Sequence, residues 1–293
     1  MKKKYICPIC SSDNISNYLK SSNQHGKKLL QIKKKFNYYR CNNCDVTFLS
    51  GIAIDKTYYQ TYYSFPESEN NVPKFKKIEN KFAEYSNNFK KGIIEQFVNN
   101  KKKIDLLDIG CGTGNFIASL DKSKYNAVGI ERDKTEYQIA KEKNITVYCS
   151  DILRQNFEDR KFDVITLWHV VEHIPEPHKL LKKIRKLLKK DGIVILTTPN
   201  SDALGFKIAK EKWFHLDAPR HIILYSKKGM KILGSKNDFK LIKTFSQTFE
   251  FPLDLFWSLK QSKNKYFMYP LYPLMKYYSK ETLTYVLTKS FEK

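Results

Sequence analysis

A glycine-rich turn in the middle of the chain constrains its fold most strongly. The apolar run Ile104–Ile109 leads directly into Gly110, Gly112 and Gly114, and a helical pattern begins after them. Glycines are needed where the backbone turns sharply and a ligand must approach it closely. The spacing Gly-x-Gly-x-Gly is shorter than the Gly-x-Gly-x-x-Gly of dinucleotide-binding proteins. The turn therefore predicts a strand, a ligand-binding loop and a helix in succession.

The chain around this turn alternates between short apolar runs and helical patterns. The expected strands are 104–109, 127–130, 146–148, 162–167 and 192–198. The expected helices are 76–100, 116–120, 135–143 and 177–190. Such alternation is typical of a parallel sheet covered by helices, so we expect an α/β domain. Residues 282–287 are expected to add the last strand.

Acidic residues follow two further strands of this pattern. Glu131 ends the expected strand at 127–130, where a carboxylate can accept hydrogen bonds from ribose hydroxyls. Asp151 follows the next strand, where a carboxylate can meet an adenine amino group. Together with Asp108 before the glycine turn, these residues indicate a bound nucleoside.

Over residues 101–200 these motifs resemble the class I S-adenosylmethionine-dependent methyltransferases. The resemblance implies S-adenosylmethionine as cofactor and a Rossmann-like methyltransferase fold, a parallel sheet with an antiparallel last strand. The residues that it assigns to the cofactor are Asp108, Gly110, Gly112 and Gly114 for the methionine part, Glu131 for the ribose, and Asp151 and Ile152 for the adenine. The short glycine turn suits this cofactor, which has no pyrophosphate. The alternative is a nucleotide fold that binds a dinucleotide or nothing.

Polar residues follow the fourth expected strand, at the sheet edge where reactive groups of open α/β sheets gather. We expect His173 to be a general base, because imidazole titrates near neutral pH, and Glu172 to orient it or to bind a substrate hydroxyl. The sequence His169-x-x-Glu172-His173 also matches an inverted zinc-peptidase motif, but that motif requires a helix and Pro175 argues against one. The alternative is that Glu172 and His173 only cap the following helix.

The Glu-His pair has two parallels in known families. Ubiquinone-type O-methyltransferases have a similar pair within a divalent-metal site, and the first acidic ligand of that site would fall at His169 here. Sugar C-methyltransferases carry a Glu-His at this place as catalytic groups. The resemblance leaves His169, Glu172 and His173 as catalytic candidates, with a second metal as an open alternative.

Four of the six cysteines form two Cys-x-x-Cys pairs, Cys7 with Cys10 and Cys41 with Cys44. No apolar signal segment precedes them, so we expect a cytoplasmic protein in which such pairs are metal ligands rather than disulfides. Four thiolates suit a tetrahedral Zn²⁺ and leave no position open, so the expected zinc ribbon is structural. The alternative is a redox pair or unligated thiols.

The expected zinc ribbon and the tyrosine-rich segment after it resemble those of deoxysugar C-methyltransferases and of bacterial methyltransferases linked to surface polysaccharide. In the deoxysugar enzymes a tyrosine after the zinc module lies near the substrate. Tyr62 and Tyr63 are candidates for that role here, among the tyrosines at 58–63. The alternative for them is ordinary aromatic packing. This chain is too short for the large third domain of the deoxysugar enzymes.

A stretch similar to Asp217-Ala-Pro-Arg220-His221 recurs in the polysaccharide-linked group. We expect Arg220 to clamp a phosphate or carboxylate and His221 to meet a sugar hydroxyl. The alternative is a loop in which Arg220 pairs with Asp217. The motifs divide the chain into a zinc ribbon (1–50), an aromatic linker and helix (51–100), a methyltransferase core (101–250) and an aromatic insert with the last strand (251–293).

The net charge of +23 bears on the partner. A positive field attracts anionic partners, but only six basic residues are arginines, on which specific readers of nucleic acid rely. We therefore prefer a small-molecule or glycan acceptor, a nucleotide-linked sugar or surface polysaccharide, with an RNA methyltransferase or a ubiquinone-type O-methyltransferase as alternatives. A non-enzymatic zinc-ribbon interaction protein is a third interpretation. No apolar run reaches the ~18 residues of a membrane span, and the aromatic insert allows only peripheral membrane contact.

Overall fold

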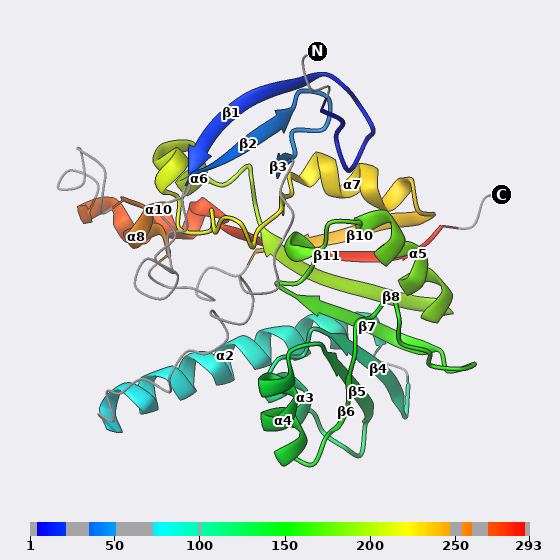
Figure 1. Ribbon diagram of the computed structural model, residues 1–293. Coiled ribbons are helices and arrows are strands. Elements are labelled where there is room, and N and C mark those ends of the chain that lie inside the picture. The colour runs from blue at the N-terminus through cyan, green and yellow to red at the C-terminus, as the bar shows by residue number, and fades with distance from the viewer. Residues whose placement is uncertain are drawn as a thin grey trace.

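The computed structural model describes residues 5–21, 35–50, 73–98, 101–246, 254–259 and 269–290. At its centre lies a seven-stranded sheet in the order β10-β11-β8-β7-β4-β5-β6 (Figure 1). Its strands in chain order are β4 (Ile104–Ile109), β5 (Tyr125–Glu131), β6 (Thr146–Cys149), β7 (Phe162–Trp168), β8 (Leu188–Pro199), β10 (Phe239–Phe245) and β11 (Thr282–Lys289). β11 runs antiparallel to β8 and β10, and the other pairings are parallel. The expected α/β sheet with an antiparallel last strand is confirmed.

The strand order places a ligand site at one edge of this sheet. From β4 the chain winds outward through β5 and β6, and then returns to the other side of β4 to form β7 and β8. In such sheets the loops after the strands on either side of this reversal separate and leave a crevice at the carboxyl ends. The glycine turn follows β4 and the histidine cluster follows β7, so both sequence motifs lie at this crevice.

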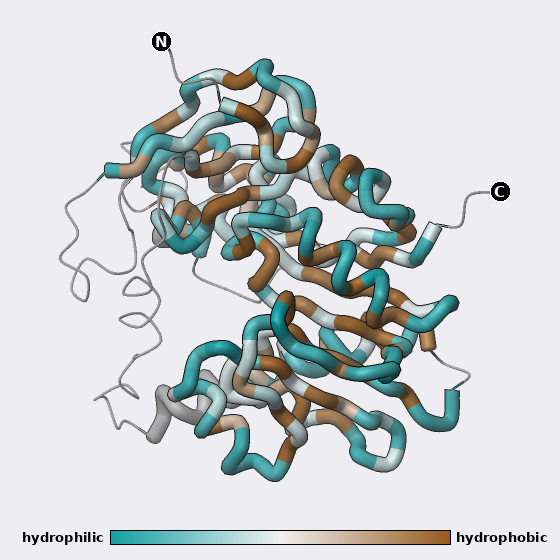
Figure 2. The backbone as a smooth tube through the Cα atoms, turned by 45° about the vertical axis from the view of Figure 1, so that its right-hand side comes forward, coloured by the Kyte–Doolittle hydropathy of each residue, from teal (hydrophilic) through white to brown (hydrophobic). Residues whose placement is uncertain are grey.

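Helices cover both faces of the sheet. They are α2 (Pro73–Val98), α3 (Asn115–Ala118), α4 (Lys134–Glu142), α5 (Pro177–Leu187), α6 (Leu204–Ala209), α7 (Lys227–Ser235), α8 (Asp254–Leu259) and α10 (Tyr272–Ser279). Apolar side chains of α2 and α3 pack on one face, and those of α5 and α7 pack on the other. Figure 2 shows the apolar residues concentrated in the strands between them. Burial on both faces explains why the inner strands β4, β7 and β8 contain continuous apolar runs.

The structure differs from the sequence predictions at the end of one helix and in one strand that was not predicted. The helix expected over 177–190 ends at Leu187, because Leu188 already pairs with Phe162 as the first residue of β8. The adjacent Lys189 is held in the strand by ion pairs with Asp105 and Asp163. Strand β10 was not predicted, since most of its residues are exposed or half-buried and it carries little apolar signal.

The N-terminal cysteine pairs lie in a second sheet that includes a strand from beyond the core. Strands β1 (Ile15–Ser21), β2 (Phe36–Cys41) and β3 (Thr47–Leu49) are antiparallel, and β3 pairs with β9 (Ile223–Leu224). In Figure 1 this sheet lies beside α7. Three of the four paired cysteines belong to the same apolar cluster as the central sheet. We call residues 5–21 and 35–50 the cysteine module.

The C-terminal elements cover the carboxyl-end region near β8. Leu255 and Leu259 of α8 are buried, whereas Leu274, Tyr277 and Tyr278 of α10 are exposed. The exposed side chains keep the prediction of peripheral membrane contact open. Within the described segments, none of the helices has both the length and the apolar character that crossing a bilayer requires.

Candidate active site

A pocket of about 210 Å³ lies where β4, β5, β6 and β7 end. It is lined by both loops that the sequence singled out, the glycine turn after β4 and the histidine-containing segment after β7. The lining residues are Ile109, Gly110, Gly112, Ile130, Glu131, Arg132, Ser150, Asp151, Ile152, Trp168, His169, Val170, His173 and Ile174. Five of the seven sequence-predicted cofactor residues, all except Asp108 and Gly114, therefore line one cavity together with the predicted base.

The glycine turn has the backbone shape that only glycine adopts without strain. Gly110 has a φ of 69°, and a Cβ built on it would lie 2.6 Å from Val170 Cγ2, so the loops after β4 and β7 touch here. Gly112 has a φ of 54° and its N–H donates to Glu131 Oε2 at 3.0 Å. Gly114 lies outside the pocket lining, and a Cβ on it would collide with Ile145, so it serves close packing rather than the pocket wall.

The carboxylates after β5 and β6 both line the pocket. Glu131 Oε1 accepts hydrogen bonds from the backbone N–H groups of Arg132 and Asp133 at 2.7 and 2.8 Å, which fixes the carboxylate at the strand end. Asp151 accepts from the N–H of Leu153 at 2.8 Å, and the neighbouring Ile152 is buried in the wall. Two fixed carboxylates beside an apolar wall suit a ribose and a flat base.

Asp108 lies beneath the pocket rather than in its lining. It is 2% exposed and accepts a hydrogen bond from Thr166 Oγ1 at 2.6 Å. Burial raises the pKa of Asp108 to about 7, although the Thr166 hydrogen bond and the charge of Lys90 act in the opposite direction. A carboxyl group under such desolvation is typical of a functional site.

His173 is held by the backbone of a distant segment. Its Nδ1 lies 2.9 Å from the carbonyl oxygen of Arg220, which can only accept, so Nδ1 carries the proton and Nε2 carries the lone pair. His221 is fixed in the same way, with Nδ1 2.7 Å from the carbonyl of His215. The two rings lie 4.8 Å apart. Burial lowers the pKa of His173 despite the attraction of Glu172, so the imidazole is neutral near pH 7.

Glu172 is fully buried beside these histidines. Neither of its oxygens has a hydrogen-bond partner among the described residues, and Oε1 lies 3.4 Å from Nδ1 of His169. Burial opposes its charge, but His169 and His173 outweigh that effect and lower its pKa. The ligand atoms of Glu172, His173 and His221 lie within 4.8 Å of one another, a donor set that also suits a divalent cation.

Several expectations for the neighbouring residues need correction. Arg220 is 5% exposed, forms a buried ion pair with Asp217 and does not line the pocket, so the predicted phosphate clamp gives way to the ion-pair alternative. Glu172 and His173 do not cap α5, because they lie in the 3-10 turn Val171–His173 and α5 starts only at Pro177. The candidates Tyr62 and Tyr63 lie outside the described residues.

The sequence analysis missed two residues at this site, one aromatic and one basic. Trp168, the last residue of β7, lines the pocket and packs edge-on against Phe116 at 5.5 Å. Lys90 of α2 places its ammonium group 5.0 Å from the Trp168 ring centre. The position of Trp168 at the carboxyl end of a predicted strand was the sequence signal that could have identified it. No sequence signal could have identified Lys90, because only the packing of α2 on the sheet brings its side chain to Trp168.

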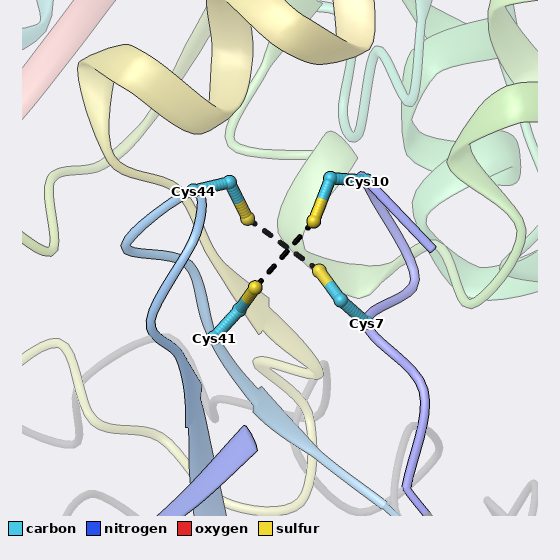
Figure 3. Close-up of side chains that lie close together, drawn as sticks. All are labelled: Cys7, Cys10, Cys41 and Cys44. Atoms are coloured by element: carbon cyan, nitrogen blue, oxygen red, sulfur yellow. Dashed lines mark hydrogen bonds between the residues drawn. The ribbon is translucent and has the colours of Figure 1, made fainter. Parts of the chain in front are cut away.

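The four paired cysteines converge at one point of the cysteine module (Figure 3). Sγ of Cys7 lies 3.5 Å from that of Cys44, and Sγ of Cys10 lies 3.4 Å from that of Cys41. A tetrahedral zinc with bonds of about 2.3 Å would separate its sulfurs by roughly 3.8 Å. The hydrogen bond with Cys44 lowers the pKa of the Cys7 thiol to about 5. The donor set and its spacing therefore fit Zn²⁺.

A second cavity of about 420 Å³ opens where β8 ends and β11 begins. Lysines of α6, of α7 and of the connection between α10 and β11 line it, together with hydroxyl, amide and apolar groups. Its lining residues are Asn200, Asp202, Leu204, Lys207, Lys227, Tyr278, Ser279, Lys280 and Leu283. Three ammonium groups against one carboxylate give this cavity a positive lining.

Comparisons with known proteins agree with this geometry. A family model described as a methyltransferase domain matches residues 82–244, more than half of the chain. A ubiquinone biosynthesis O-methyltransferase of Coxiella burnetii (strain Dugway 5J108-111) is 31% identical over 113 residues, covering 36% of this chain and 48% of that protein. Its counterpart from Pelagibacter ubique (strain HTCC1062) is 34% identical over 116 residues, covering 37% and 47%. The chain thus spans about half the length of these relatives.

Solved structures share the fold. Phosphoethanolamine N-methyltransferase 2 of Haemonchus contortus superposes with a TM-score of 0.53 at 19% identity, covering 70% of this chain and 53% of the other. The plantazolicin methyltransferase BpumL superposes with a TM-score of 0.52 at 19% identity, covering 79% and 94%. The Rossmann-like arrangement of strands and helices expected from the sequence is therefore confirmed.

Proposed function

Because the chain belongs to the methyltransferase domain family, we propose that it transfers a methyl group from S-adenosylmethionine to a small-molecule or glycan acceptor. One observation carries the proposal. The glycine turn, Glu131 and Asp151 line the same pocket as His173, so a cofactor site and a proton acceptor open into one space. The preferred acceptors are a nucleotide-linked sugar or a surface polysaccharide.

Residues of the pocket divide between cofactor and acceptor. Glu131 would hold the ribose hydroxyls, Asp151 and Ile152 the adenine, and the turn around Gly110 the methionine part. When bound, S-adenosylmethionine supplies an electrophilic methyl group on its sulfonium. The protein has to align the acceptor with that methyl group and remove the proton of the acceptor hydroxyl.

His173 is suited to remove that proton. Its Nε2 carries the lone pair because Nδ1 donates to the Arg220 carbonyl, and the lowered pKa keeps the ring neutral. The proton of the hydroxyl passes to Nε2, the oxygen forms the bond to carbon, and the carbon–sulfur bond breaks to leave S-adenosylhomocysteine. The buried carboxylate of Glu172 would stabilise the imidazolium that results.

A second candidate is a ubiquinone-type small-molecule O-methyltransferase in which a divalent cation assists. Two observations favour it. The relatives are named as ubiquinone biosynthesis O-methyltransferases, and the buried Glu172 carboxylate lies close to ring nitrogens of His173 and His221. In this alternative the three side chains would hold the cation, which would polarise the acceptor hydroxyl. Metal dependence of turnover separates the two mechanisms.

The second cavity supports an anionic acceptor. It lies at the carboxyl end of β8, which runs parallel to β7, and so at the same edge of the sheet as the cofactor pocket; Lys207, Lys227 and Lys280 line it. Ammonium groups are common phosphate ligands, as point charges rather than forks. The diphosphate of a nucleotide-linked sugar matches this lining better than a neutral quinone precursor does.

The cysteine cluster is proposed to hold a structural Zn²⁺. Cys7, Cys10, Cys41 and Cys44 supply all four positions of a tetrahedral site, so no coordination position remains for substrate. The cluster lies within the shared apolar core, which suits a role in folding.

The test of the proposed function is a labelling experiment. Purified protein receives methyl-tritiated S-adenosylmethionine and a host-cell extract, and the labelled product is treated with ribonuclease. Label in ribonuclease-resistant sugar or glycan is the expected result. Label in a ribonuclease-sensitive polymer would overturn the acceptor assignment and favour the RNA methyltransferase alternative. No label above the level of heated protein would favour the non-enzymatic interpretation.

A further inference from the structure

The peptide from Arg220 to Ile222 is held from three directions. The hydroxyl of Tyr38 donates to the carbonyl of His221 at 3.2 Å. The N–H of Leu49 donates to the carbonyl of Ile222 at 2.8 Å, and the N–H of Ile222 donates to the carbonyl of Glu172 at 2.8 Å. Two of these bonds lie on the peptide unit that joins His221 to Ile222 and the third lies on the unit after it, so the segment is fixed directly behind Arg220.

This segment in turn orients the base. The carbonyl of Arg220 accepts from Nδ1 of His173, and the ring of His221 lies against the ring of His173. The direction of His173 is therefore set by the Arg220–His221 peptide unit, which directly precedes the unit that Tyr38 holds and whose own N–H donates to the carbonyl of Asp217 at 2.9 Å. A shift of that peptide would weaken the Nδ1 hydrogen bond and allow the proton to occupy Nε2 instead.

Two of the three bonds that hold the segment come from the cysteine module, and the third comes from Glu172. Tyr38 and Cys41 belong to the same strand, β2. Strand β3 pairs with β9 directly after the segment, and the hydroxyl of Ser226, at the end of that connection, donates to the carbonyl of Cys44 at 2.7 Å. The cysteine cluster and the base are thus joined by backbone pairing and two hydroxyl groups.

We propose that Tyr38 is a positioning residue for acceptor activation, through which the cysteine module fixes the orientation of His173. The inference rests on the proposed role of His173 as base. It predicts that the module contributes to turnover beyond its contribution to stability. Loss of a hydrogen-bond partner that orients a metal-ligating histidine typically reduces activity by about 10- to 100-fold, and by analogy we expect an effect at the lower end of that range here.

A matched pair of tyrosine variants tests the inference. Tyr38→Phe removes the hydroxyl bonded to the segment, while Tyr39→Phe, on the adjacent position of the same strand, removes one that donates to Tyr5 at 2.8 Å. Both side chains are buried. Tyr38→Phe should lower kcat about tenfold with little change in KM for S-adenosylmethionine, and Tyr39→Phe should leave kcat near the wild-type value.

Nitrogen NMR of the histidine rings gives a readout that needs no acceptor. The protein has six histidines, and His173→Gln identifies the His173 signals. In Tyr38→Phe the signals of His173 should move toward a mixture of tautomers, and in Tyr39→Phe they should stay unchanged. Unchanged His173 signals in folded Tyr38→Phe, or equal changes in both variants, would overturn the inference.

A second measurement covers the case in which Tyr38→Phe does not fold. Zinc is extracted from wild-type protein with a thiol reagent and chelator, then restored as the metal alone, while the His173 signals are followed. They should move on extraction and return on restoration, and signals indifferent to zinc would contradict the coupling. Turnover retained by His173→Gln would instead refute the assignment of His173 as the base. The spectra would still test whether the cysteine module sets the orientation of His173.

Discussion

Asp108 illustrates how one buried residue links stability to function. Its pKa of about 7 in the folded protein exceeds the ~3.9 of an unfolded aspartate. Below pH ~4 both states are protonated; as the pH rises toward 7, ionisation favours the unfolded chain, so this residue increasingly destabilises the fold. A loss of folding stability at a residue beside a pocket is expected where that residue contributes to ligand binding.

Asp108→Asn should therefore stabilise the protein without cofactor. The gain in Tm over wild type should grow from about pH 4 to pH 7 and then level off, because the amide never ionises. If Asp108 serves the methionine part of the cofactor, the same variant should bind S-adenosylmethionine about tenfold more weakly, since the carboxylate charge beneath the pocket is lost. Thermal melting across this pH range and equilibrium binding at pH 7.5 check both parts. A pH-independent Tm difference would show that the Asp108 carboxyl group does not titrate abnormally.

His173→Gln tests the base directly. The glutamine amide cannot take up the proton from the hydroxyl of the methyl acceptor, so turnover should be abolished. Affinity for S-adenosylmethionine should stay within a few-fold of the wild-type value. His178→Gln is the matched control, because His178 bonds the carbonyl of Ile9 and the amide of Asn237 and does not line the pocket. The measurements are methyl transfer and cofactor binding. Turnover near the wild-type rate in His173→Gln would assign the base elsewhere.

At the scale of single elements, the turn after β4 can be tested by replacing one glycine. Gly110→Ala forces a positive φ on alanine, at a cost of about 1–2 kcal/mol, and pushes its Cβ against Val170. Gly92→Ala in α2 is the control, because a Cβ there has open space and alanine favours a helix by about 0.5–1 kcal/mol. Denaturant unfolding should show a lower free energy of unfolding for Gly110→Ala and no decrease for Gly92→Ala. Equal stability of both variants would contradict the tight packing of the turn.

The strands were predictable wherever local pattern decides structure. The inner strands β4, β5, β7 and β8 are recognisable as apolar runs because they are largely buried, whereas the edge strand β6 is largely exposed. β9 gives no such signal, since two residues pair with β3 across about 175 positions of the chain. The contact between the rings of His173 and His221 depends on that pairing, so the sequence supplied both residues as candidates without indicating that they meet.

At the scale of the whole molecule, the cysteine module and the central sheet share one apolar core. Cys41 and Cys44 belong to the same cluster as Ile165 of β7 and Leu180 of α5. Spacing alone predicted that the four cysteines form one cluster, but it suggested a separate ribbon over residues 1–50. The shared core arises because β9, from the far side of the methyltransferase fold, completes the sheet of the module.

This shared core predicts that loss of the metal destabilises the entire fold. Cys41→Ser removes one ligand at a fully buried position, whereas Cys149→Ser alters an exposed cysteine outside the cluster. The first variant should lose its zinc and unfold at a lower temperature in a single calorimetric transition, because an unfolded module exposes core residues of the sheet. The second should keep about one zinc per chain and the wild-type Tm. Two separate transitions in Cys41→Ser, with cofactor binding intact after the first, would mean that the module folds independently of the sheet.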